Sequence, residues 1–298
     1  MRNKKSKPSR EHHWWPITLA ENWSKKNEEI NRVSSNGEIQ SINPKRFAYI
    51  VDGHNIILGE SSPLNQNFEQ EFKDADGRFS NIIHELKKLT KVHIKDCNND
   101  TEYLKHNYDN EFLNNLCHSI VSLLVRAPMT RNEIVGMVEA IGTPMSKKDL
   151  KTLSAANMTG KLNQLTKRLK DQGKFVILFS KDHEFIYGDG FYHNISMSIL
   201  KSVLDERILL PLTPHLAVMY VNPIQYMSEQ RLMTLNANHK LVMLVNQMVQ
   251  IYSKDYLFYK SERPNLIKEF LINKHLVLEF NESIENLFNE VPGCFKNL

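Results

Sequence analysis

The chain has 298 residues, of which 41% are hydrophobic and 24% charged, a balance typical of globular proteins with one large domain or two small ones. No apolar run approaches the roughly 20 residues that cross a bilayer, and the start of the chain lacks the apolar core of a secretory signal, so we expect no membrane partner. Three cysteines without a CxxC spacing cannot all pair, which indicates a cytoplasmic location.

The net charge of +4 comes from the start of the chain. The first ten residues contain no acid and five basic residues, namely Arg2, Lys4, Lys5, Lys7 and Arg10. Without these residues the chain is close to neutral, which argues against a long groove for nucleic acid. Residues 1–11 are therefore interpreted as a disordered basic tail, and the alternative is an arm that contacts nucleic-acid phosphates.

Short strands are predicted in the N-terminal section. Residues 30–33 and 38–42 flank the pair Asn36-Gly37, and Asn-Gly between short alternating runs is typical of a β-hairpin. Residues 47–51 form a further run rich in β-branched and aromatic residues. The section is therefore expected to be strand-rich.

Residues 79–172 are predicted to be mostly helical. In one segment apolar residues recur at three- and four-residue spacing, namely Phe112, Leu116, Ile120, Leu123 and Leu124. Pro128 ends that helix, because proline has no N–H to continue it. Residues 92–108 are polar and rich in asparagine, and they are predicted to form a loop.

Two further helix starts are predicted from capping residues. Thr130 and Glu133 form an S/T-x-x-E capping box. Ser146 precedes Asp149 by the same spacing and starts a long polar helix that ends near Gly173.

Apolar runs bounded by turn residues follow Gly173 and predict strands of one sheet. These runs are residues 175–179, 185–187, 209–212 and 216–221. The later predicted elements are a helix with an apolar face over residues 241–252, an aromatic strand over residues 256–259, and a last clear helix that starts at Pro264.

Together these elements predict an α+β fold. We expect residues 12–298 to form a single domain whose mixed sheet is built from the N-terminal and C-terminal segments, with a helical middle subdomain inserted at residues 79–172. In this arrangement the N-terminal strands pair with strands from residues 175–222.

Four short motifs are spread over most of the chain. They are His12-His13-Trp14-Trp15-Pro16, Arg126-Ala127-Pro128, Phe185-Ile186-Tyr187-Gly188-Asp189 and Pro211-Leu212-Thr213-Pro214. In this order they resemble the bacterial family named domain of unknown function 4238, and Leu244-Val245-Asn246 resembles a later motif of it. The resemblance implies a fold and a site, and no chemistry.

The chain departs from the family pattern at one motif. Gly188 replaces a serine, and Phe191 replaces a proline two residues after the motif aspartate. If the family's turn binds a ligand through the serine hydroxyl, this protein has lost that contact.

Three motif residues each have a functional and a structural interpretation. His13, next to His12, is either a member of a metal or proton-transfer site, or part of a strand on which one histidine is buried and the other is exposed to water. No HExxH or CxxC spacing supports a metal site. Arg126 either holds a carboxylate or phosphate, or caps a helix end. Asp189 is either a functional carboxylate at the end of a strand or a common turn residue between two glycines.

We hypothesise that His13, Arg126 and Asp189 converge on one polar site, because each belongs to a shared motif and their charges are complementary. On this basis the protein is an intracellular bacterial hydrolase or nuclease that acts on phosphate-bearing or nucleic-acid material. The alternative is a non-catalytic binding or regulatory module, in which the same residues are buried as structural hydrogen-bond partners. No cofactor is identified from the sequence.

Overall fold

The computed structural model describes residues 11–25, 28–51, 55–56, 66–67, 69–97, 102–140, 145–195, 205–222, 230–276 and 281–293. The predicted basic tail, residues 1–10, lies outside this part of the chain, and so does its predicted contact with nucleic acid. Glu11 was assigned to the tail, but it belongs to strand β1 (Glu11–His13), where it pairs with Val51. Every helix of the described residues is too short or too polar to span a bilayer.

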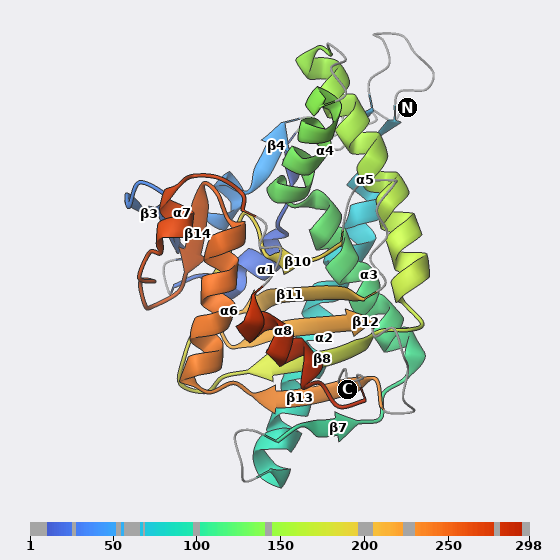
Figure 1. Ribbon diagram of the computed structural model, residues 1–298, viewed down its shortest axis with the longest axis vertical. Helices are drawn as coiled ribbons and strands as arrows, with labels where there is room; N and C mark the ends of the chain where they lie inside the picture. Colours follow the sequence, from blue (N-terminus) through green and yellow to red (C-terminus); the bar gives the residue numbers. More distant parts are fainter. Residues whose placement is uncertain are drawn as a thin grey trace, which may run out of the picture.

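A six-stranded mixed sheet lies at the centre of the molecule (Figure 1). Its strand order is β10-β11-β12-β8-β13-β7, and neighbours are antiparallel except for β8 and β13, which are parallel. The strands are β7 (Leu104–His106), β8 (Lys174–Phe179), β10 (Tyr192–His193), β11 (Glu206–Thr213), β12 (Leu216–Asn222) and β13 (Leu232–Asn236).

Both faces of this sheet are covered, which explains why its long strands β8, β11 and β12 contain continuous apolar runs. Along β8, Phe175, Ile177 and Phe179 pack into one hydrophobic cluster, whereas Val176 and Leu178 pack into another. The first cluster is completed by α2, α3 and α5, and the second by α6 and α8, which lie in front of the sheet in Figure 1. The helices are α2 (Glu69–Asp96), α3 (Asn110–Arg126), α5 (Lys147–Leu169), α6 (His239–Tyr252) and α8 (Glu282–Asn289).

A second, four-stranded sheet joins the two ends of the chain, in the order β3-β2-β14-β9. Its strands are β2 (Ile30–Ser34), β3 (Ile39–Ile42), β9 (Tyr187–Gly188) and β14 (Tyr256–Tyr259). The α+β class and the sheet built from both chain ends are therefore confirmed. The hairpin is confirmed too, and Gly37 in its turn has a φ of 84°.

Two details of the predicted sheet are wrong. The N-terminal strand β2 pairs with β14, and β9 from the 175–222 region lies on the other side of β14. The apolar run at residues 185–187 does not continue the central sheet, because Phe185 donates its N–H to Pro214 O (2.7 Å) at the edge of that sheet and the chain then turns into the smaller one.

The predicted loop at residues 92–108 is also wrong. Helix α2 continues to Asp96, and β7 adds an edge strand to the central sheet. The edge strand is anchored by a polar contact, because Nε2 of His106 lies 2.8 Å from the Thr234 hydroxyl of β13.

The predicted helix boundaries differ in two places and are confirmed in a third. Helix α4 (Pro128–Ala140) begins at Pro128 rather than after Thr130, whose hydroxyl donates to Leu124 O (2.6 Å). No helix starts at Pro264, because Gln250 of α6 bonds both Asn265 O and Ile267 N and holds this segment extended. The start of α5 at Ser146 is confirmed, since its hydroxyl accepts from Asp149 N (3.1 Å).

Shorter elements complete the fold. They are α1 (Ile17–Ala20), η1 (Glu21–Trp23), η2 (Pro44–Arg46), β4 (Tyr49–Val51), β5 (Asn55–Ile56), β6 (Gln66–Asn67) and α7 (Lys268–Leu271). Strand β1 pairs antiparallel with β4, which places the N-terminal motif beside helices α3 and α4 (Figure 1).

Candidate functional site

Arg126 is fixed at the end of α3 by contacts to other parts of the chain. Its side chain is 1% exposed, and its two terminal nitrogens donate to Asp76 of α2 at 2.6 and 3.1 Å. Nε donates to Ser122 O (3.1 Å), and Nη1 also donates to the backbone oxygen of His13 (3.4 Å). A guanidinium has five N–H donors, so this set uses most of them within the protein.

The two histidines of the N-terminal motif differ in burial, because successive side chains of a strand face opposite ways. His12 is fully buried, whereas His13 is partly exposed and meets the ring of Tyr49 edge-on at 5.9 Å. His13 therefore lies beside Arg126 as predicted, but the two meet through a backbone carbonyl rather than through the imidazole.

Asp189 is held by a different set of partners. Its carboxylate accepts hydrogen bonds from the backbone N–H groups of Lys254 (2.9 Å) and Asp255 (3.1 Å), in the turn between α6 and β14. Neither Arg126 nor His13 contacts it in the described structure. The predicted convergence of all three side chains is therefore wrong, and the reason is that the carboxylate is saturated by an adjacent turn.

A histidine that the sequence analysis did not single out lies next to Asp189. Nδ1 of His275 bonds Tyr252 O (2.9 Å), and Nε2 lies 3.9 Å from Oδ2 of Asp189. Nδ1 donates to this backbone oxygen, and the separation of Nε2 from Asp189 is too long for a hydrogen bond, so the two side chains interact only through their charges. Burial raises the pKa of Asp189, and the charge of His275 acts in the opposite direction.

The glycines on either side of Asp189 allow α6 to approach. A Cβ at Gly190 would lie 1.8 Å from Tyr252 O, and a Cβ at Gly188 would lie 2.0 Å from the Ser253 hydroxyl. The resembled family has a serine at the position of Gly188. Here that space is filled by the hydroxymethyl group of Ser253, which bonds Val249 O (2.7 Å) and Gly190 O (3.2 Å).

The residues just before Asp189 are bonded to other motifs. Trp23 donates its indole N–H to Phe185 O (2.9 Å). Asn246 of α6 accepts from Ile186 N (3.0 Å) and donates to Glu184 O (2.9 Å).

Aromatic packing connects the same segment to the N-terminal motif. The Tyr187 ring stacks on Trp15 with centroids 4.8 Å apart and on Phe258 at 4.6 Å. Trp14, Trp15 and Trp23 are all buried and anchor this part of the core. We call residues 184–190, with Trp15, Trp23, Asn246 and the turn at residues 252–256, the motif hub.

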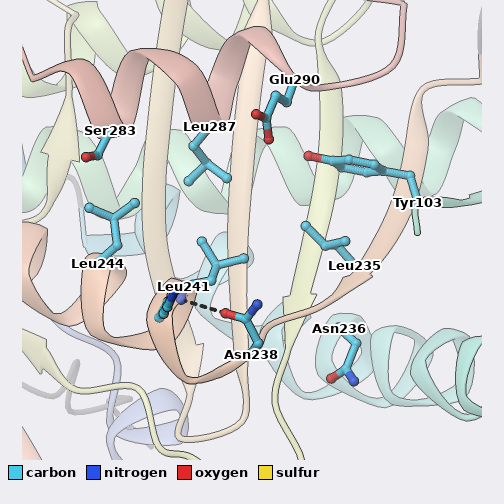
Figure 2. A pocket seen from close by; sticks show the side chains of 10 residues that line it. Tyr103, Leu235, Asn236, Asn238, Leu241, Leu244, Ser283, Leu287 and Glu290 are labelled. Carbon is cyan, nitrogen blue, oxygen red and sulfur yellow. Dashed lines mark hydrogen bonds between the residues drawn. The ribbon is translucent and has the colours of Figure 1, made fainter. Parts of the chain in front are cut away.

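A pocket of about 390 Å³ lies apart from the motif hub, between α6 and α8 over β13 (Figure 2). Its apolar surface is made by Leu235, Leu241, Leu244 and Leu287. Its polar rim is made by Tyr103, Asn236, Asn238, Lys240, Ser283 and Glu290. We call this cavity the α6–α8 pocket, and no motif residue of the predicted site lines it.

The rim carries opposite charges on opposite walls. Lys240 stands in the first turn of α6, which contains no acid, and Glu290 directly follows α8. In Figure 2, Leu241 and Leu287 lie between Asn238 on one side and Glu290 on the other. The described residues contain no group of three or more histidine, cysteine, aspartate or glutamate side chains that could hold a metal ion.

The family of the chain follows from a match that spans most of its length. Residues 11–263 match the model of the family described as protein of unknown function (DUF4238). The chain belongs to the DUF4238 family. The resemblance seen in the four motifs is thereby confirmed. No curated protein and no solved structure matches the chain.

The DUF4238 match covers the motif hub completely but the α6–α8 pocket only in part. It contains all of the motif hub, together with β13 and α6. It ends before α8, so one wall of the α6–α8 pocket lies outside the segment that defines the family. The DUF4238 motifs of this chain therefore coincide with internal bonding, and the pocket has one wall inside the matched segment and one wall beyond it.

Proposed function

We propose that the protein is a non-catalytic binding module of the bacterial cytoplasm, with the α6–α8 pocket as its binding site. The observation that supports this proposal is the internal bonding of Arg126 and Asp189, the two charged motif residues. Each donates to or accepts from other parts of the chain, and both are buried. A catalytic group must instead reach a substrate atom at hydrogen-bond distance.

The properties of the α6–α8 pocket fit binding better than chemistry. A few hundred cubic ångströms lined by apolar side chains with a small number of polar groups is typical of small-molecule sites. Its rim contains one carboxylate, Glu290, and no histidine or cysteine. The cytoplasmic setting is supported by Cys97 and Cys117, which are free thiols.

The predicted hydrolase or nuclease is tested together with this proposal. The full chain is incubated with DNA, RNA and nucleotides, with and without divalent metal ions. We expect no turnover above a protein-free control. Turnover that disappears in the folded Arg126→Lys variant would overturn the proposal and restore the enzyme hypothesis.

Binding at the pocket is tested with uncharged apolar fragments, by protein-observed NMR. We expect fragments to shift the signals of α6 and α8, and Leu244→Trp, which fills the pocket, to abolish the shifts. Met243→Trp is the matched control, because Met243 lies on the same helix, is 57% exposed and does not line the pocket. If no fragment shifts these signals, or if both variants bind alike, the pocket is not the binding site.

A further inference from the structure

The α6–α8 pocket limits the chemistry of its ligand through its two charges. Lys240 and Glu290 are both exposed, and neither makes a hydrogen bond or an ion pair with another residue in the described structure. Each is therefore available to a ligand without breaking a contact of the fold. An exposed charge that is unpaired in the free protein gains a partner at little desolvation cost.

The apolar surface between these charges requires an apolar body on the ligand. Leu235 and Leu287 are buried at 6% and 8% exposure, and Leu241 and Leu244 are partly exposed. An apolar group laid on these side chains removes their remaining surface from water, which is the main source of affinity in such pockets.

The combination of charges excludes simpler ligands. An apolar anion such as a fatty acid would pair with Lys240 but would leave Glu290 without a partner. An apolar cation would pair with Glu290 but would leave Lys240 without a partner. A zwitterion whose two charges are separated by an apolar body satisfies both walls, with its ammonium at Glu290 and its carboxylate at Lys240. Asn238 supports the carboxylate end, because its oxygen accepts from Leu241 N (3.0 Å) and its amide N–H groups remain donors.

We propose that the α6–α8 pocket binds a short apolar peptide in its zwitterionic form. This inference rests on the proposed function and adds the ligand class to it. Such a peptide carries its ammonium at one end, its carboxylate at the other and apolar side chains between them. Since Glu290 lies beyond the DUF4238 match, the selectivity for the ammonium end is a property of this chain rather than of the shared segment.

The test compares ligands that differ only in their charges. Leucine and the dipeptide Leu-Leu are titrated against the full chain by protein-observed NMR, beside N-acetyl-Leu-Leu, which lacks the ammonium, and Leu-Leu-amide, which lacks the carboxylate. We expect Leu-Leu to bind, and removal of either charge to weaken binding by about two- to fivefold, as for single exposed ion pairs. Leucine carries both charges on one carbon and cannot reach both walls, so it should bind more weakly than Leu-Leu, and equal affinity would contradict the inference.

Variants of the protein provide the reciprocal test. Glu290→Gln should remove the preference for Leu-Leu over N-acetyl-Leu-Leu, and Lys240→Gln should remove the preference over Leu-Leu-amide. Glu262→Gln and Lys148→Gln, at exposed positions away from the pocket, are the matched controls and should change neither.

The outcomes separate this inference from the proposed function. If uncharged apolar fragments occupy the pocket but charged and capped peptides bind equally, the zwitterion inference is wrong and the binding module stands. If neither fragments nor peptides shift the signals of α6 and α8, both are wrong.

Discussion

The two ends of helix α6 meet the rest of the molecule in opposite ways. At its C-terminal end, Tyr252 and Ser253 lie against the glycines around Asp189, and the Ser253 hydroxyl and the Asp189 carboxylate are hydrogen-bonded within the chain. At its N-terminal end, about 21 Å away along the helix axis, Lys240 and Leu241 border the α6–α8 pocket.

This difference teaches that a shared polar motif does not by itself indicate a catalytic site. A buried charged or polar group costs several kcal/mol unless it is bonded, so a fold can retain Arg, Asp and Asn at fixed positions purely to satisfy one another. The ligand site is better sought where polar groups are exposed and have no partner in the chain.

The largest effect is expected at the buried guanidinium. Arg126→Met keeps much of the side-chain volume but leaves His13 O and the Asp76 carboxylate without their donor. We expect a loss of about 3–5 kcal/mol in the free energy of unfolding, as when one partner of a buried ion pair is removed. Urea denaturation measures it, and Arg263→Met, at an exposed position, is the control. A loss below 1 kcal/mol would mean that the pair contributes little to the fold.

A smaller loss is expected where α6 approaches the Asp189 turn. Gly190→Ala places a methyl group 1.8 Å from a backbone oxygen, and relieving that clash should cost about 1–3 kcal/mol or more. Gly77→Ala in α2 meets no atom within 4 Å, and we expect it to stabilise the protein by about 0.5–1 kcal/mol. The melting temperatures of the two variants should therefore shift in opposite directions. Equal shifts would mean that Gly190 is not in close contact with Tyr252 O.

Acid should destabilise the protein through His193 of β10. Burial lowers the pKa of this histidine to about 4. At pH values between this pKa and the ordinary histidine pKa, the unfolded chain therefore binds a proton that the folded chain does not. Stability is then lost as pH falls below about 6.5, by about 2 kcal/mol between pH 7 and pH 5 from this group. His193→Gln should flatten the dependence of unfolding free energy on pH by that amount, and an unchanged slope would contradict the prediction.

The smallest effect is expected at the centre of the aromatic stack. The Tyr187 hydroxyl is buried and has no hydrogen-bond partner in the described structure. Removing it in Tyr187→Phe keeps the stacking on Trp15 and Phe258, so the free energy of unfolding should change by less than about 1 kcal/mol or rise slightly. A large loss would show that the hydroxyl does have a partner and that the hub is bonded differently.

The parts of the fold that follow from local pattern could be predicted. The Asn36-Gly37 turn, the end of α3 at Pro128 and the Ser146 cap are decided by neighbouring residues, and each is confirmed. Strand partners were predicted less well, because β2 and β14 are separated by more than two hundred residues and nothing in their sequences selects one another. The polar segment containing β7 was missed, since a short edge strand has little apolar pattern.

The motif residues could be named from the sequence, but their partners could not. The approach of Arg126 to His13 was predicted, whereas Asp76 was not, because an aspartate in a polar helix carries no signal of its own. Asp189 was expected beside a histidine of the N-terminal motif, and the structure places it beside His275. The α6–α8 pocket was missed because its leucines are ordinary helix residues in sequence.

The central claim is that Asp189 serves the fold, and the most direct measurement is the free energy of unfolding of Asp189→Asn. The amide keeps the size of the side chain but has only one acceptor oxygen, so it cannot replace both carboxylate oxygens that accept from Lys254 N and Asp255 N. We expect a loss of about 1.5–3 kcal/mol, and less than about 0.5 kcal/mol for Asp182→Asn, an exposed aspartate on the preceding turn. If Asp189→Asn instead unfolds with the same free energy as the wild type, the carboxylate is not a structural partner, and a functional role for Asp189 has to be reconsidered.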